Sequence, residues 1–426
     1  MARDPSSPVK RRRVFYIPGY DPIHPRRYRE LYRKEGAAQA EISGYRIDLK
    51  PRQGDRYGWN VAARIDDTVT RAEVEVLVWS DIVRDSMSNS IAATYGQLIR
   101  TAATYIGSGA LRRLMWLRKG PVIAALYPVG MLLAQALAAI VLGAVLGALL
   151  SGAFGWVVGK VFGLFGAAPS GLFWSLILNA LWWGAFCAAA VVTLRWFKAR
   201  DGKFYAYYLM HDYAYSCQFG GANPPELESR MAEFTDIIAA ALTDEVDEVL
   251  VVGHSSGAHL AVSILADLLR AKRLPANGPA LSFLSLGQVV PMVSFLPRAG
   301  RLRADLHYLS QQERVAWIDV TAPGDGCSFA LCDPVAVSGV APPNQRWPLI
   351  LSAAFTQTLS PERWKSLRWR FFRLHFQYLC AFDRPRDYDY FQITAGPLTL
   401  ADRYRGRAPS RSRIDVAASR YTSMAA

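Results

Sequence analysis

Cysteine is scarce in this sequence, and no nucleic-acid-binding motif is present. The 426 residues include five cysteines, which form neither a CxxC pair nor a metal-ligand spacing. Their odd number argues against a disulfide framework, so we expect a reducing compartment and no metal centre. The first residues, MARDPSSPVKRRRVFYIPGY, also lack the apolar core of a secretory signal, and we therefore expect no export.

Basic residues outnumber acidic ones, which gives a formal net charge of +14. They cluster beside apolar runs and at the two chain ends rather than on one recognisable nucleic-acid motif. We therefore expect no nucleic-acid partner. Hydrophobic residues make up 51% of the chain, which is enough for a full-sized core and an additional element.

Two long segments carry almost no charge. Residues 121–150 contain no charged side chain, and residues 172–194 contain Asn179 as their only strongly polar residue. About 20 apolar residues cross the hydrocarbon core of a bilayer, so both segments are predicted to be transmembrane helices. A buried helical hairpin inside a soluble core is the alternative interpretation.

Basic residues flank this hairpin on its two outer sides, which predicts that both outer ends are cytoplasmic in an inner or plasma membrane. The flanking residues are Arg112, Arg113, Arg118 and Lys119 before the first span, and Arg195, Lys198, Arg200 and Lys203 after the second. Between the spans, residues 151–171 are rich in glycine and contain Lys160. They are interpreted either as a tight luminal turn or as a short re-entrant piece.

Small residues recur along the first span, at Gly143, Gly147 and Gly152. They permit close packing on the second helix or on a copy of the chain, which makes a homo-oligomer a further expectation. The preceding residues, 89–117, mix apolar and polar side chains and end in a basic group. We expect them to lie along the membrane surface.

Strand-like and helix-like stretches alternate on both sides of the hairpin, which is typical of a parallel sheet covered by helices. We expect residues 1–88 and 205–397 to form one α/β domain, interrupted by the membrane segment at residues 89–204. An even number of spans places both parts on the same side of the membrane. Residues 398–426 are basic and poor in large apolar side chains, so a disordered tail that touches anionic head groups is predicted.

The sequence EVLVVGHSSGAHLA places a GxSxG pentapeptide, residues 253–257, between a strand-like and a helix-like stretch. A sharp strand-to-helix turn lifts the central serine, Ser255, clear of its neighbours and sets it at a helix N-terminus. Gly253 and Gly257 avoid clashes with the adjoining strand and helix. An ordinary glycine turn is the alternative interpretation.

This segment resembles the nucleophile elbow of the α/β-hydrolase family, in its lipase and esterase branches. The resemblance covers about residues 13–79 and 225–397. It implies a mostly parallel sheet flanked by helices, and a triad in the chain order serine, acid, histidine. It also implies an oxyanion hole formed by the backbone N–H of Ser256 and by the loop after an early strand, where Gly19 and Tyr20 stand.

In that chain order the base follows the acid, and only His375 follows the strand that precedes the candidate acids. The other histidines are 24, 211, 254, 259 and 307. The segment RWRFFRL before His375 is predicted to be the last strand, which leads into its loop. A histidine that only packs among phenylalanines is the alternative interpretation.

Two aspartates compete for the role of the acid. Asp325 follows the strand-like VAWIDVTA, where the family places its acid, although 50 residues separate it from His375. Asp333, in LCDPV, is kept as the alternative. Asp319 lies within the strand and is interpreted as structural.

These residues predict a serine hydrolase that cleaves a carboxylic ester or thioester, and the chemistry requires no metal and no cofactor. The bilayer is one expected partner, and its proximity favours an apolar or lipid-like substrate. A catalytically inactive scaffold with the same fold, which organises a membrane complex, is the second functional hypothesis. A transport role is disfavoured because neither span carries an ionisable residue.

Overall fold

The computed structural model describes residues 7–87 and 90–425. The expected boundary at residues 88 and 89 therefore lies outside the described residues. The chain divides into two compact units, one formed by Met1–Ser86, Thr101–Ala124 and Tyr215–Ala426, the other by Met87–Arg100 and Ala125–Ala214.

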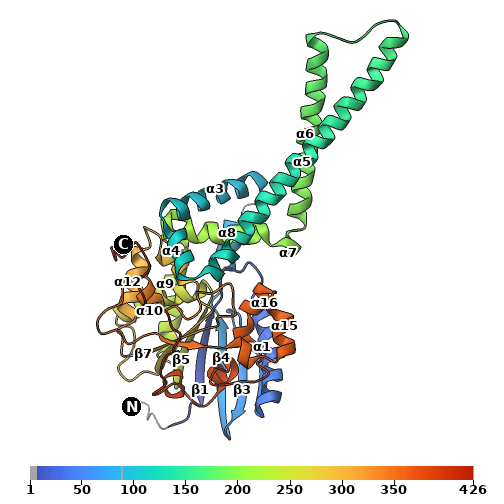
Figure 1. The fold of residues 1–426 in the computed structure, drawn as a ribbon. Coiled ribbons are helices and arrows are strands. Elements are labelled where there is room, and N and C mark those ends of the chain that lie inside the picture. Colours follow the sequence, from blue (N-terminus) through green and yellow to red (C-terminus); the bar gives the residue numbers. More distant parts are fainter. Residues whose placement is uncertain (1–6, 88–89, 426) are drawn as a thin grey trace. The chain divides into compact units, whose positions relative to one another are not determined.

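The first unit contains a mixed eight-stranded sheet with the strand order β2-β3-β4-β1-β5-β6-β7-β8 (Figure 1). From β4 to β8 every neighbouring pair is parallel, whereas β2, β3 and β4 pair in antiparallel fashion. The strands are β1 Arg11–Ile17, β2 Arg46–Pro51, β3 Gly58–Ile65, β4 Thr68–Val76, β5 Glu248–His254, β6 Ala280–Leu286, β7 Val315–Thr321 and β8 Leu349–Ser352. The expected α/β class with a mostly parallel, helix-flanked sheet is confirmed.

Helices connect and cover the strands. They are α1 Arg26–Ser43, α2 Ser80–Ser86, α3 Ile91–Gly107, α4 Ala110–Leu117, α5 Lys119–Leu164, α6 Leu172–Ala199, α7 Asp201–Phe204, α8 Ala206–Cys217, α9 Pro225–Ala241, α10 Gly257–Arg270, α11 Val290–Ser294, α12 Gly300–Leu309, α13 Pro334–Val337, α14 Phe355–Thr358, α15 Pro361–Leu367, α16 Phe371–His375, α17 Tyr390–Ala395 and α18 Leu400–Arg403. Two short 3₁₀ turns, Gln218–Gly221 and Gln377–Leu379, complete the described elements.

The central strands are buried on both faces, which explains why they are continuous apolar runs rather than alternating ones. Every residue of β5 and β7 is buried. Along β5, Leu250 and Val252 join the cluster that includes aromatic residues of α1 and α17. Because side chains alternate along a strand, Val249 and Val251 face the other side, where α10 packs with α9 and α12. Strand β3, which lies next to the edge strand β2, instead alternates buried and exposed residues over most of its length.

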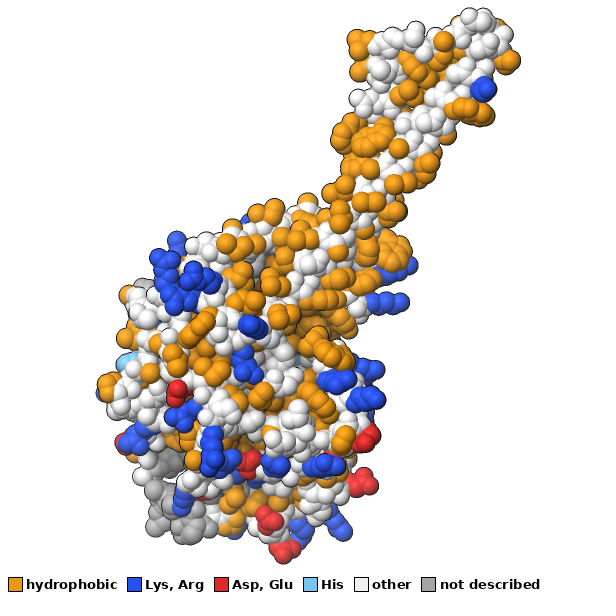
Figure 2. All heavy atoms as spheres, in the orientation of Figure 1, with side chains coloured by type: hydrophobic (Ala, Val, Ile, Leu, Met, Phe, Trp, Pro, Cys, Tyr) orange, Lys and Arg blue, Asp and Glu red, His pale blue; other side chains and the backbone are white. Residues whose placement is uncertain are grey.

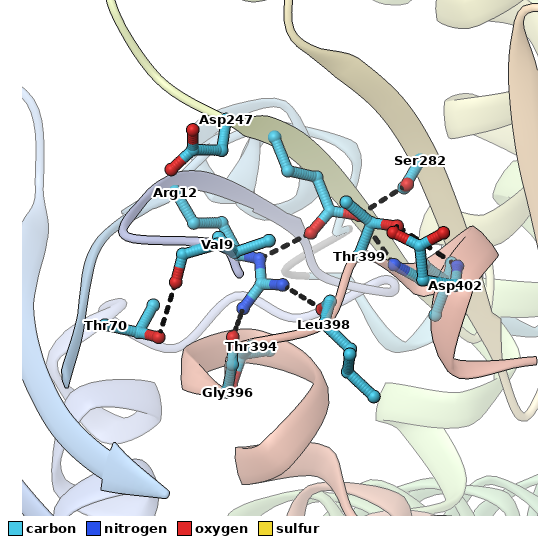
Figure 3. A network of polar contacts seen from close by, with 12 residues as sticks. Val9, Arg12, Thr70, Asp247, Ser282, Thr394, Gly396, Leu398, Thr399 and Asp402 are labelled. Carbon is cyan, nitrogen blue, oxygen red and sulfur yellow. Dashed lines mark hydrogen bonds and ion pairs between the residues drawn. The ribbon is translucent and has the colours of Figure 1, made fainter. Parts of the chain in front are cut away.

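A buried ion pair joins the two sequence-distant parts of this sheet (Figure 3). Arg12 Nε, in β1, donates to Glu248 Oε2, in β5, at 2.6 Å, and both side chains are fully buried. The remaining Arg12 N–H groups donate to the carbonyl oxygens of Gly396 and Leu398, and Glu248 also accepts from Leu400 N at 2.8 Å. The network therefore fixes the start of the C-terminal segment to the sheet.

The prediction of a disordered tail at residues 398–426 is wrong for its described part. Asp333 N donates to Ile414 O at 2.8 Å, Ala418 N donates to Val337 O at 3.0 Å, and Tyr421 Oη donates to Ser108 O at 3.1 Å. The segment has few large apolar side chains, but several of its backbone groups form hydrogen bonds with earlier parts of the α/β unit. Composition alone does not reveal such pairing.

Residues 101–124, expected within the membrane segment, belong instead to the α/β unit. Tyr105 Oη donates to Met292 O at 2.9 Å, and Leu114 and Leu117 are buried. Some of the apolar side chains that suggested a membrane-surface helix thus pack on protein, whereas Ile106 and Trp116 are exposed. Residues 205–214, expected in the second half of the α/β domain, belong to the other unit.

Two helices are long and apolar enough to cross a membrane: α6, which lies in the second unit, and α5, which belongs to that unit from Ala125 onward. α5 is a single helix of 46 residues, so residues 151–164 are neither a turn nor a re-entrant piece, and only residues 165–171 separate the helices. Residues 151–164 contain no proline that would end the helix. None of the residues of α6 is buried.

Small residues bring these two helices together. A Cβ atom at Gly143 would lie 2.9 Å from the Phe186 carbonyl oxygen, and one at Gly147 would lie 2.9 Å from the Trp182 carbonyl oxygen. Gly152, by contrast, has no neighbour within 4 Å. Hydrophobic side chains cover the face of the pair that Figure 2 shows.

Candidate active site

The candidate nucleophile occupies a sharp turn between β5 and α10. Ser255 has φ of 57°, the left-handed region that a residue with a side chain rarely adopts. Its N–H donates to Leu286 O at 2.9 Å, and its carbonyl accepts from Ala258 N at 3.1 Å. The predicted context of strand, sharp turn and helix is therefore present around Ser255, which is partly exposed.

The structure brings Asp325 and His375 together. Asp325 follows β7, and His375 is the last residue of α16. The distance from His375 Nδ1 to Asp325 Oδ2 is 2.8 Å, and both residues are buried. Because a carboxylate only accepts, this contact assigns the proton to Nδ1 when the imidazole is neutral and leaves Nε2 with a free lone pair.

His375 Nε2 has no hydrogen-bond partner among the described residues, although it is buried. Two observations place this ring beside the elbow. A Cβ atom at Gly287 would lie 3.0 Å from His375 Cε1, while the preceding Leu286 carbonyl holds the Ser255 N–H. The ring of His254, the residue before Ser255, lies 4.9 Å from the His375 ring.

Asp325 accepts several hydrogen bonds besides the one from His375. Cys327 N donates to Oδ1 at 2.9 Å, and Tyr378 Oη donates to Oδ2 at 3.0 Å. Burial raises the pKa of Asp325, but the neighbouring His375 and the hydrogen bonds outweigh burial and lower this pKa below its usual value. The carboxylate is therefore ionised at neutral pH and suited to stabilise an imidazolium.

Asp333, the alternative acid, does not pair with His375 in the structure. It is the N-cap of α13, where its side chain accepts from Val335 N at 2.9 Å and Ala336 N at 3.2 Å. Asp319, expected to be structural, accepts from Ser285 Oγ at 2.5 Å inside the sheet. Burial raises the pKa of Asp319 to about 8.

The loop after β1 contacts the elbow closely, as the oxyanion-hole prediction requires. The N–H of Tyr20, however, does not have the predicted role. A Cβ atom at Gly19 would lie 2.9 Å from Ser255 Cβ, so only glycine fits there without displacement. The N–H of Tyr20 donates to Ser256 Oγ at 2.9 Å. Tyr20 N–H is therefore already engaged, and it holds the loop against the turn rather than pointing at a substrate.

Two residues of the site were missed from the sequence. Tyr378 bonds Asp325 and accepts from Ala322 N at 2.9 Å, which fixes the acid's turn. The distance from His254 Nε2 to the carbonyl oxygen of His375 is 3.0 Å, and burial lowers the pKa of His254 to about 3. His254 therefore stays neutral and supports the backbone of His375. A histidine within the pentapeptide was a signal for such a role, whereas one tyrosine among 20 was not.

Asp325, Cys327 and His375 also offer three potential metal ligands within 4.8 Å of one another. Two ligands bound tetrahedrally to zinc at about 2.1 Å lie roughly 3.4 Å apart. The 2.8 Å between His375 Nδ1 and Asp325 Oδ2 is shorter and has the length of a hydrogen bond. The pair therefore fits proton chemistry better than metal ligation.

Comparison of the chain with family models, with curated proteins and with solved structures finds no match. Function is therefore inferred from the site itself.

Proposed function

We propose that this protein is a membrane-anchored serine hydrolase of the α/β-hydrolase type, which cleaves a carboxylic ester or thioester of an apolar, lipid-like substrate. One observation carries the proposal. Ser255 occupies a left-handed turn between a buried strand and a helix, beside a His375–Asp325 pair whose Nε2 has no hydrogen-bond partner among the described residues.

Each residue has a distinct role in the proposed reaction. His375 Nε2 takes the proton of Ser255 Oγ as this oxygen attacks the acyl carbonyl carbon. Asp325 holds the imidazole in the required tautomer and stabilises its charged form. The proton then passes to the leaving alcohol or thiol, and water, activated by the same histidine, releases the acid from the acyl-enzyme.

The oxyanion that forms during attack requires N–H donors. Ser256 N–H at the start of α10 is the first, and its position at a helix N-terminus favours negative charge. Gly19 N–H is the proposed second donor, since the N–H of Tyr20 is engaged by Ser256 Oγ. The structure, in the part of the chain that it describes, has no hydrogen bond between Ser255 and His375. Catalytic hydrogen bonds of this kind commonly tighten when substrate binds.

Exposure of the apolar helices supports the membrane anchor. A core helix of a soluble protein buries its apolar side chains, yet no residue of α6 is buried and only 22% of the most apolar window of α5 is buried. Exposed apolar residues such as Leu149, Phe173 and Val192 would be costly in water. A bilayer removes this cost, and the basic flanks support the proposal that the α/β unit is cytoplasmic.

An activity-based fluorophosphonate probe, which reacts with activated serines, tests the proposal. The wild-type protein in detergent is expected to be labelled, and Ser255→Ala is expected to abolish labelling. Ser366→Ala, at an exposed serine of α15, is the control and should be labelled like the wild type. A folded wild-type protein that is not labelled would favour the inactive scaffold instead.

A further inference from the structure

An open cavity of about 330 Å³ lies beside the turn that carries the proposed catalytic acid. One wall is formed by Pro323, Asp325 and Gly326, and the other by residues 116–121, where α4 ends and α5 begins. All of these residues belong to the α/β unit. The volume is near the lower limit for small-molecule sites, so the cavity fits part of a lipid rather than a whole one.

The wall formed by residues 116–121 contributes two cations, Arg118 and Lys119. Neither side chain forms an ion pair with a described carboxylate. Asp325, on the opposite wall, keeps its negative charge but is only 2% exposed, and its carboxylate accepts hydrogen bonds from His375, Tyr378 and Cys327. Two cations therefore face one buried carboxylate, and the resulting net positive charge of the cavity suits an anion.

Apolar groups line the same cavity. Trp116 and Pro121 lie beside the cations, and Trp116 is 67% exposed. Gly326 faces the ring of Phe371, which would lie 3.1 Å from a Cβ atom there and is itself exposed. Two cations beside the exposed Trp116 ring match an amphiphile, which places a charged group beside hydrocarbon.

We infer that this cavity binds the phosphate of a glycerophospholipid whose acyl ester is cleaved at Ser255, an inference that rests on the proposed function. Asp325 lines the cavity and pairs with His375 Nδ1 at 2.8 Å, so in the proposed triad the cavity is separated from Ser255 only by the width of the Asp325–His375 pair. The phosphate must therefore be a few bonds from the ester, as it is in a glycerophospholipid. In acyl-coenzyme A the phosphates lie much farther from the thioester.

Full-length protein in nonionic detergent provides the test, with dioctanoyl phosphatidylglycerol and neutral dioctanoylglycerol as substrates. The readout is the ratio of kcat/KM for the phosphate-bearing substrate to kcat/KM for the neutral one. Arg118→Gln combined with Lys119→Gln is expected to lower this ratio by about tenfold or more, because charge-assisted hydrogen bonds to phosphate are lost.

Matched variants separate the cavity from general charge effects. Arg112→Gln combined with Arg113→Gln removes the same charge from exposed positions of α4 that do not line the cavity, and it should keep the wild-type ratio. Exchange of the two cations, Arg118→Lys with Lys119→Arg, keeps both charges and should retain most of the wild-type kcat/KM ratio.

An unchanged ratio in the glutamine variant, or an equal fall in the Arg112 and Arg113 control, would overturn the inference while leaving the hydrolase proposal intact. The inference would also be overturned if the glutamine variant lost kcat/KM for octanoyl-coenzyme A but not for dioctanoyl phosphatidylglycerol. The cavity would then bind a phosphate that lies far from the acyl bond. Failure of the proposed function itself is seen separately, as the absence of turnover with every substrate and of fluorophosphonate labelling.

Discussion

Asp325 and Asp333 are only eight residues apart in the sequence, yet their surroundings give the two carboxylates different roles. Asp325 is surrounded by donors that favour its charged form, including the imidazole of His375. Asp333 caps α13 and accepts from Gln345 Nε2 at 2.7 Å, and burial raises its pKa. Only the first carboxylate can orient a histidine.

Substitution by asparagine distinguishes the two aspartates. Asp325→Asn should lower kcat for p-nitrophenyl esters by about 10³- to 10⁴-fold, because an amide can favour the wrong imidazole tautomer. Asp333→Asn keeps an N-cap of similar quality, so its kcat should stay within about threefold of the wild type. Initial rates measured at saturating ester check both values, and equal, mild losses in the two variants would contradict the assignment of Asp325.

Local sequence patterns predicted the turn around Ser255 but not the contacts between segments that are distant in the sequence. Ser255 lies within a pentapeptide flanked by a recognisable strand and helix, and His375 was selected because few histidines were available. Tyr378 bonds Asp325 across 53 positions, and no local periodicity signals that contact. The engagement of Tyr20 N–H by Ser256 Oγ likewise depends on the three-dimensional approach of two loops.

At the scale of elements, the turn between β5 and α10 holds an unfavourable backbone conformation. A left-handed residue other than glycine costs about 1–3 kcal/mol and persists only where its surroundings enforce it. The loop after β1 provides that enforcement. A Cβ atom at Gly257 would lie 2.1 Å from Ile17 O and 2.6 Å from Pro18 O, so the two backbones are in direct contact.

Gly257→Ala is therefore expected to separate the loop after β1 from the elbow. The clash involves backbone atoms that cannot rotate away, so the free energy of unfolding should fall by about 3 kcal/mol or more. Gly107→Ala, at the end of α3, has no neighbour within 4 Å and should change stability by less than about 1 kcal/mol. Thermal unfolding in detergent compares the two variants, and similar melting temperatures would refute the close contact.

Element boundaries were hardest to predict where local and tertiary preferences disagree. The segment RWRFFRL was predicted to be the last strand, but it ends in helix α16, and β8, Leu349–Ser352, is the last strand instead. β8 has only four residues, too few for a periodic signal, and it is defined by pairing with β7. The central strands were found because their apolar runs are long and buried on both faces.

At the scale of the whole molecule, one sheet is assembled from two parts of the chain that are separated by the apolar helices. β1 pairs in parallel with β5, and the buried Arg12–Glu248 ion pair spans 236 positions. Both parts must therefore lie on the same side of any membrane that α5 and α6 cross. At 1.5 Å per residue, the 46 residues of α5 extend about 69 Å, roughly twice the thickness of a bilayer's hydrocarbon core.

The hairpin topology predicts opposite accessibility for two exposed serines. Ser170 lies in the short connection between α5 and α6, and Ser366 lies in α15 of the α/β unit. In intact cells a membrane-impermeant maleimide should label Ser170→Cys above the wild-type background, whereas Ser366→Cys should require permeabilisation. The proposed orientation keeps the basic outer helix ends in the cytoplasm, so the connection is expected to face the other side. The reverse pattern would invert the orientation, and labelling of both variants only after permeabilisation would show that the hairpin does not cross the membrane.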